Sequence, residues 1–324
     1  MKRLCLYLAI CFLPLFAKAQ KVVSIKIDGT INPASAGFIR NAIEKATSDK
    51  AECLIIYLNT PGGLLKSTRV IVSDILNASI PVVVYVAPGG AHAGSAGVFI
   101  TLASHIAVMA PSTNIGAAHP VSMQGGMDST MNDKATNDAA AFIRTIAKKR
   151  NRNFEWADEA VRNSVSITEA EALEKKVIDL VAKDEQDLLR QIHGRNIALE
   201  TGSKTLQTIS AKVDQVEMSF AERLLDMISD PNVAYILMML GFYGLLFELY
   251  SPGSIAPGVL GVICLILAFY AMHTLPLNYA GLALIVVAII LFILEVKITS
   301  HGILGIGGIV ALALGSIMLI KTSS

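Results

Sequence analysis

The pattern of apolar and polar positions predicts that the chain begins as a domain of alternating strands and helices. Short β-branched or apolar runs, typical of strands in a parallel sheet, occur at 22–31, 53–58, 81–86 and 106–109. Stretches with apolar residues at helical spacing occur at 34–47, 64–77, 95–103, 131–150, 155–164 and 168–175. This alternation predicts a parallel sheet with right-handed crossovers and with helices on both faces.

The last part of the chain has a different pattern. Between 232 and 320 the charged side chains are Glu248, Glu295 and Lys297. Four apolar stretches lie at 233–249, 257–273, 280–294 and 303–320, each near the lower length limit for a membrane-spanning helix. The sequence around Glu248 resembles that around Glu295, which indicates a duplicated helix pair. We interpret both carboxylates as residues at the membrane interface, with a functional carboxylate as the alternative.

These patterns divide the chain into four segments. Residues 1–19 have a basic start, an apolar run and the sequence Ala17-Lys18-Ala19, as in a secretory signal peptide cleaved before Gln20. An uncleaved anchor is the alternative. We expect an α/β domain at 20–187 and a linker or appendage at 188–231, followed by a membrane domain of about four transmembrane helices at 232–321. The linker ends in an amphipathic helix at 219–228, which we expect to lie along the membrane interface or to serve as a plain connection.

This organisation and the composition limit the possible functions. The chain is predicted to be a multi-pass protein of the inner (plasma) membrane, with its α/β domain facing the periplasm or exterior. A net charge of +1 gives no basic field for nucleic acid. Cys53 lies in a strand pattern and Cys264 in a membrane segment, so we expect no disulfide. No His, Cys, Asp or Glu cluster has metal-ligand spacing, and we expect neither a metal nor a cofactor.

The candidate chemistry lies in two glycine-rich loops that follow predicted strands, at 59–63 and 87–97. Ser95 sits between glycines where the second loop becomes a helix, a position suited to an exposed nucleophile. The N–H groups of Ala96 and Gly63 are candidate donors to an oxyanion. The alternative is that Ser95 is only a helix N-cap.

A serine nucleophile needs a base, and the spacing leaves two candidates open. Lys134 could serve as the base if burial beside apolar helix residues favours its neutral form. The alternative interpretation is that Lys134 is an ordinary exposed lysine on a helix. His119 could serve without such a shift, and its alternative is a structural or substrate-lining histidine. His92 lies three residues before Ser95 and is a weaker candidate, because the sequence offers no partner for it, and we interpret His105 as structural.

Five stretches together resemble the NfeD-type membrane serine peptidases, of the ClpP/crotonase fold and close to signal peptide peptidase A. They are LIIYLNTPGG, AGSAG, IAVMAPSTNIGAAHPV, a lysine before an apolar helix ending near 151–153, and ITEAEALEKKVIDLVA. The resemblance implies an α/β ClpP/crotonase-like domain with a parallel sheet, followed by an all-α multi-pass membrane domain. It maps the nucleophile to Ser95 and the general base to Lys134, in a Ser-Lys dyad, and the glycine pair to Gly62 and Gly63. A Ser-His arrangement with His119 stays the minority alternative.

The resemblance also implies a function, a serine endopeptidase that cleaves hydrophobic peptide segments. Gly62 and His119 are expected to bind substrate, and the loop at 122–133 is expected to cover the cleft. The expected partners are a hydrophobic peptide, a stomatin-like membrane protein, membrane lipid and further copies of the chain. Longer family members carry an OB-like domain after the spans, which we expect to be absent here. The alternatives are a degenerate membrane scaffold of the same fold and, less favoured, an acyl-CoA hydratase.

Overall fold

The computed structural model describes residues 20–121, 129–251, 255–271, 279–297 and 302–319, which form two compact units that divide after Arg223. The predicted signal peptide and most of the predicted cleft-covering loop lie outside the described residues.

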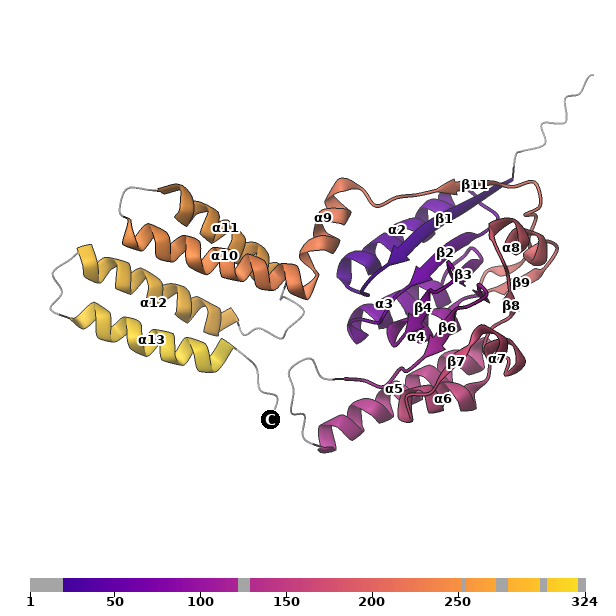
Figure 1. The fold of residues 1–324 in the computed structure, drawn as a ribbon, viewed down its shortest axis with the longest axis horizontal. Helices are drawn as coiled ribbons and strands as arrows, with labels where there is room; N and C mark the ends of the chain where they lie inside the picture. The colour runs from indigo at the N-terminus through magenta and orange to yellow at the C-terminus, as the bar shows by residue number, and fades with distance from the viewer. Residues whose placement is uncertain (1–19, 122–128, 252–254, 272–278, 298–301, 320–324) are drawn as a thin grey trace, which may run out of the picture. The chain divides into compact units, whose positions relative to one another are not determined.

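The first unit is built on a six-stranded parallel sheet with the order β11-β1-β2-β3-β5-β8 (Figure 1). Its strands are β1 (Lys21–Asp28), β2 (Leu54–Asn59), β3 (Val82–Val86), β5 (Ile106–Met109), β8 (Leu180–Val181) and β11 (Lys212–Gln215). Alternate residues enter two separate cores: Leu54 and Ile56 of β2 face one, Cys53 and Ile55 the other. Both faces are covered, which explains the continuous apolar runs of the central strands.

Helices cover one face of this sheet, and the late part of the unit covers the other. The first set is α2 (Pro33–Ser48), α3 (Leu65–Leu76), α4 (Ala96–Ala103), α5 (Ser129–Lys149), α6 (Phe154–Arg162) and α7 (Glu169–Glu174). The opposite face packs against α8 (Glu185–Ile192) and residues near the hairpin of β9 (Asn196–Leu199) and β10 (Gly202–Thr205). A second sheet joins β4 (His92–Gly94), β6 (Asn114–Gly116) and β7 (Ser166–Thr168). The α/β class with a parallel sheet is therefore confirmed.

The α/β unit extends beyond residue 187, where the sequence pattern places its end. The following segment, predicted as a linker, buries Leu188, Leu189 and Ile192 in the second core. Farther on, β11 pairs in parallel with β1, with Val213 opposite Val22. The segment completes the sheet and covers one of its faces, so it is part of the folded unit. It is followed by α9 (Phe220–Ile228).

The second unit consists of two helix pairs (Figure 1). They are α10 (Pro231–Tyr250) with α11 (Ile255–Ala271), and α12 (Tyr279–Lys297) with α13 (Ile303–Leu319). By length and hydropathy, one described helix, Asn232–Tyr250, could cross a membrane; the other apolar helices of the described residues are shorter. The C-terminal region is therefore helical and apolar, as predicted.

Glycines and the Glu295 carboxylate contribute to the contacts within these two helix pairs. A Cβ at Gly244 would lie 3.0 Å from the Cα of Gly261, so glycines let α10 and α11 approach closely. Glu295 accepts hydrogen bonds from the N–H groups of Gly302 and Gly305, at 3.0 and 2.9 Å. Glu295 therefore satisfies free amides at the start of α13, which gives this carboxylate a structural role.

Candidate active site

Ser95 occupies a strained turn at the start of α4. Its φ is 46° and its ψ is −104°, a backbone conformation that non-glycine residues rarely adopt. The Ser95 side chain makes no capping hydrogen bond to the helix. The N-cap alternative therefore does not explain this serine. A half-buried hydroxyl on a strained turn, unused by the helix, is available for chemistry.

The glycine loop after β2 packs directly against this serine. A Cβ at Gly62, whose φ is +130°, would lie 2.6 Å from the Cβ of Ser95. A Cβ at Gly63 would lie 2.1 Å from the carbonyl oxygen of Ile31. Neither position can accept a side chain without displacing its neighbour. The structure thus brings the predicted glycine pair and Ser95 together.

Backbone hydrogen bonds fix the two loops to each other. The N–H of Thr60 donates to the carbonyl of His92 at 2.8 Å, and the N–H of Gly94 donates to the carbonyl of Thr60 at 2.9 Å. The N–H of Ser95 donates to the carbonyl of Ala117 at 3.0 Å. Strand β4, whose three residues carry no periodic signal in the sequence, therefore aligns the loops that surround the serine.

Two amide groups beside Ser95 are available as oxyanion donors. In the described part of the chain, neither the N–H of Gly63 nor that of Ala96 has a hydrogen-bond acceptor. Gly63 is exposed, and Ala96 is the first residue of α4. The N-terminal end of a helix carries partial positive charge, which favours a developing negative charge at this point.

Lys134 lies on the second turn of α5 and is exposed, as in the alternative of an exposed helix lysine, and it lacks the burial on which its role as a base was conditional. It makes no hydrogen bond or ion pair with any described residue, and the structure shows no contact between Lys134 and Ser95. The apolar face of α5 that was expected to bury it begins farther along the helix, where Ala139, Ala140 and Ile143 are buried.

The packing of α4 against α5 nevertheless places the two residues at the same end of the helix pair. Phe99 stacks on Phe142, with ring centres 5.7 Å apart. Later in both helices, Arg150 donates through Nε to the carbonyl of Ala103 at 2.8 Å. Because later residues of α4 contact later residues of α5, the two helices run in the same direction. Ser95 and Lys134 precede Phe99 and Phe142, so both lie towards the N-terminal ends.

Helix α3 shares this direction. Arg69 of α3 binds Asp138 of α5, and farther along, Arg150 approaches the carbonyl of Ile75 at 3.5 Å. The N-terminal ends of α3, α4 and α5 therefore point the same way. The N-terminal end of a helix carries partial positive charge, so this end of the helices favours an oxyanion.

His119 is held by another element. Its Nδ1 lies 2.9 Å from the carbonyl oxygen of Val161 in α6, and because a carbonyl oxygen only accepts, Nδ1 donates this hydrogen bond. The ring is half-buried, and it makes no hydrogen bond to Ser95. His119 is therefore anchored to α6 through Nδ1, and among the described residues no partner is seen for its Nε2.

A buried arginine clamp that the sequence analysis missed holds the far end of α4. Arg152 donates to the carbonyls of Leu102 and Ser104, at 2.5 and 3.0 Å, and pairs with Asp179 at 2.6 Å. Only 2% of its side chain is exposed. Cations near a helix C-terminus satisfy its free carbonyls and complement its dipole. The available signal was two arginines at the end of a predicted helix, which by itself does not distinguish a clamp from a solvated helix end.

His105 belongs to the same cluster. The N–H of Val82 donates to its Nδ1 at 3.2 Å, and Arg150 approaches its Nε2 at 3.3 Å. Burial, followed by the charges of Arg150 and Arg152, lowers the pKa of His105 to about 3. His105 is therefore neutral and structural, in agreement with the interpretation from the sequence.

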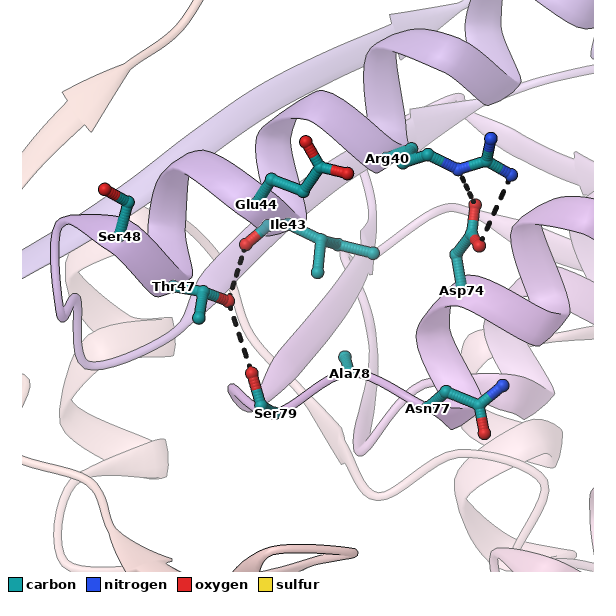
Figure 2. Close-up of a pocket in the computed structure, with 9 residues that line it drawn as sticks. All are labelled: Arg40, Ile43, Glu44, Thr47, Ser48, Asp74, Asn77, Ala78 and Ser79. Carbon is teal, nitrogen blue, oxygen red and sulfur yellow. Dashed lines mark hydrogen bonds and ion pairs between the residues drawn. The ribbon is translucent and has the colours of Figure 1, made fainter.

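A separate pocket lies away from these loops, between α2 and α3 (Figure 2). It has a volume of about 510 Å³ and is open to solvent. Its polar groups already bind one another: Arg40 pairs with Asp74 at 3.0 Å, and Thr47 donates to the carbonyl of Ile43. We therefore place the candidate site at Ser95. Among the described residues, no group of three or more His, Cys, Asp or Glu side chains could hold a metal ion.

The fold and the site define a class of protein: a membrane protein whose α/β domain carries a serine on a strained turn and is followed by apolar helices. Residues 21–192 match the family described as NfeD1b, N-terminal domain, and residues 232–324 match the NfeD integral membrane domain. The chain therefore belongs to the NfeD family of membrane proteins, and the resemblance noted in the sequence is confirmed.

Two relatives extend over nearly the whole chain. The Membrane-bound protease PH1510 of Pyrococcus horikoshii is 36% identical over 310 residues, which cover 94% of this chain and 70% of that protein. Membrane protein NfeD1b of Bacillus subtilis is 32% identical over 313 residues, which cover 95% and 70%. This family therefore includes a membrane-bound protease.

Solved structures of the 1510-N membrane-bound stomatin-specific protease share the fold of the α/β unit. A lysine-to-alanine mutant in complex with a substrate peptide is 34% identical and has a TM-score of 0.60, covering 65% of this chain and 98% of that one. A serine-to-alanine mutant is also 34% identical and has a TM-score of 0.58, covering 62% and 99%. The α/β unit thus shares its fold with a membrane-bound protease.

Proposed function

We propose that this chain is a membrane-anchored serine endopeptidase with a Ser-Lys dyad. The observation that carries the proposal is the strained, uncapped Ser95 at the start of α4, packed against Gly62 and beside two amides without acceptors. Strain at a polar residue persists where the surrounding structure enforces it, and it is concentrated at functional sites.

In the proposed mechanism, the Ser95 hydroxyl oxygen attacks the carbonyl carbon of the scissile peptide bond. Neutral Lys134 accepts the hydroxyl proton, and the amides of Gly63 and Ala96 hold the negative oxygen of the tetrahedral intermediate. The resulting ammonium of Lys134 then gives its proton to the leaving amine as the carbon–nitrogen bond breaks. Water hydrolyses the acyl group from Ser95, which restores both residues.

One feature of the relatives and one of this chain favour Lys134 as the base. Solved structures of the 1510-N protease carry alanine in place of a serine and of a lysine, and the two substituted positions are separated by nearly as many residues as Ser95 and Lys134. In this chain, the parallel packing of α4 and α5 puts both candidates at the same end of the helices. Closing the remaining gap requires the Lys134 side chain to turn towards Ser95 when substrate binds.

The proposed substrate is a hydrophobic peptide segment. Apolar side chains are exposed at three places along the predicted cleft: Leu65 at the start of α3, Met131 on the first turn of α5, and Val121 after His119. We assign Gly62 and His119 to substrate binding. Because the related 1510-N protease is described as stomatin-specific, we propose a stomatin-like membrane protein as the natural partner.

We further propose that the second unit anchors the protein through about four spans, in contact with membrane lipid. The two helix pairs and the match to the NfeD integral membrane domain support this anchoring. A cleaved signal at 1–19 would place the α/β unit on the periplasmic or exterior side. Assembly into a homo-oligomer is part of the same proposal.

The test is cleavage of apolar peptides by the full chain in detergent. Ser95→Ala and Lys134→Ala should each abolish cleavage without loss of folding, and the double variant should be little worse than either one, because both residues act in one step. Undiminished cleavage by Ser95→Ala would refute the proposal. Absence of cleavage by the unaltered chain would favour the non-enzymatic scaffold.

A further inference from the structure

Arg69, on the second turn of α3, ties that helix to α5. Its guanidinium donates to the Asp138 carboxylate at 2.5 Å, and its central carbon lies 4.2 Å from the centre of the Phe142 ring. Phe142 in turn stacks on Phe99 of α4. A single arginine therefore contacts α5 at two successive turns, and the second of these turns packs on the helix that begins after Ser95.

These contacts fix the level of Lys134 relative to the glycine loop. Lys134, Asp138 and Phe142 are spaced four apart and lie on one face of α5. Arg69 is likewise one turn after Leu65, the first residue of α3. Because α3 and α5 run in the same direction, the bond between Arg69 and Asp138 places Lys134 at the level of Leu65, two residues after the glycine pair.

Asp138 is also the carboxylate that could keep Lys134 protonated. An aspartate and a lysine four positions apart on a helix attract each other, and this attraction favours the ammonium form. Arg69 binds this carboxylate instead. The side chains of Arg69 and Asp138 are 38% and 64% exposed, so their pairing adds little to stability by itself.

The other charged or titratable groups on the early turns of α5 and on the neighbouring elements are Asp133 on α5, Lys66 on α3, Glu155, Asp158, Glu159 and Arg162 on α6, and His119; α4 carries none. Arg144 and Arg162 both bind Asp158, and Val161 holds His119. Asp133 is adjacent to Lys134 in sequence and lies on a different face of the helix. Asp138 is therefore the acidic group one turn from Lys134 on its own face.

We propose that Arg69 is a positioning residue for the Lys134 base, because it holds the Asp138 carboxylate away from the lysine amine. The inference rests on the proposed function, and it assigns to this pair a role in the protonation state of the base. Arg69 touches no reacting atom in this role.

The test records the single-turnover acylation rate against pH, with the full chain in detergent and an activated ester of an apolar peptide. Arg69→Met frees Asp138 to pair with Lys134, and the ionisation that controls the rate should move up by about 0.3 to 0.7 pH unit. Below that ionisation, acylation should be about two- to fivefold slower. Adding Asp138→Asn to Arg69→Met should return the ionisation to its original position, and Arg69→Lys should leave it there.

Two results would overturn the role of Arg69: an unmoved ionisation in Arg69→Met, or a shift that persists in the double variant. If Arg69→Met does not fold, Arg69→Gln serves in its place, since its amide cannot neutralise Asp138, and the same shift is expected. Lys134→Ala separates the two hypotheses. If Lys134→Ala is inactive and the ionisation of Arg69→Met has not moved, only the role of Arg69 is wrong. If Lys134→Ala retains the full acylation rate and the same ionisation, the proposed base is wrong as well.

Discussion

At the scale of single residues, the absence of a side chain at Gly62 is what lets the glycine loop reach Ser95. A Cβ at this position would come within 2.6 Å of the Cβ of Ser95, and the φ of +130° disfavours any other residue. The close approach of loop and serine is therefore a property of one glycine, and a single added methyl group should separate them.

We predict that Gly62→Ala lowers kcat/KM for peptide cleavage by about 100-fold or more, since a displacement near 1 Å at a reacting group can cost that much. Gly37→Ala is the matched control. Gly37 lies inside α2, and an added Cβ meets nothing within 4 Å. That variant should keep full activity and gain up to about 1 kcal/mol of stability. Peptide cleavage and thermal unfolding measure both effects, and equal activity in the two variants would contradict the close packing.

His105 gives a prediction for the pH dependence of stability. Its pKa is about 3 in the folded chain, below the ordinary value of 6.5, so below pH 6.5 the unfolded chain binds a proton that the folded chain does not. Folding stability should therefore fall as the pH drops from 6.5 towards 3, by at most about 1.4 kcal/mol per pH unit from this group. His105→Gln should flatten the slope in denaturant unfolding. The same slope in both proteins would show that His105 is not responsible.

At the scale of elements, α4 is fixed at both ends, by the loops around Ser95 and by the arginine clamp. We predict that Arg152→Met lowers the free energy of unfolding by about 3 to 5 kcal/mol, because it leaves helix carbonyls and Asp179 without their buried partner. Arg190→Met is the control: its pair with Asp187 is 3.6 Å long, its side chain is 68% exposed, and its loss should cost less than about 1 kcal/mol. Similar losses in both variants would argue against the clamp.

Elements with a strong periodic pattern could be predicted from the sequence, and shorter ones could not. The runs at 53–58 and 106–109 form β2 and β5, because strands buried on both faces are apolar throughout. Strands β4, β6 and β7 have three residues each, too few to show alternation. Helix α8 does carry signals, the Asp184 cap and the spacing of Leu188, Leu189 and Ile192, but the predicted domain boundary at 187 divides them and assigns the three apolar residues to a linker or appendage.

The candidate site was predictable to a similar degree. The glycine loops and Ser95 were identified because small residues at a strand–helix junction are informative from sequence alone. The arginine clamp and the pair of Arg69 with Asp138 were not, since ion pairs between residues far apart in sequence depend on how the helices pack. The choice between Lys134 and His119 also depends on that packing, and the Ser-Lys dyad stays a prediction.

At the scale of the whole molecule, the account requires the α/β unit to face the periplasm or exterior. The folded unit extends to Arg223, so a reporter enzyme fused after Glu217 would follow the complete sheet. We predict that a reporter active only in the periplasm is active in this fusion, and that one active only in the cytoplasm is inactive. The reverse result would exclude the exported orientation and the signal peptide with it.

The central claim is that Ser95 is acylated with Lys134 as the base, and the pH dependence of acylation tests it most directly. In the full chain, the single-turnover acylation rate should rise with pH through one ionisation in the neutral-to-alkaline range, and this ionisation should vanish with the activity in Lys134→Ala. His119→Ala should retain it. A single ionisation near the ordinary histidine value of about 6.5 that vanishes in His119→Ala and survives in Lys134→Ala would contradict the account and identify an imidazole base.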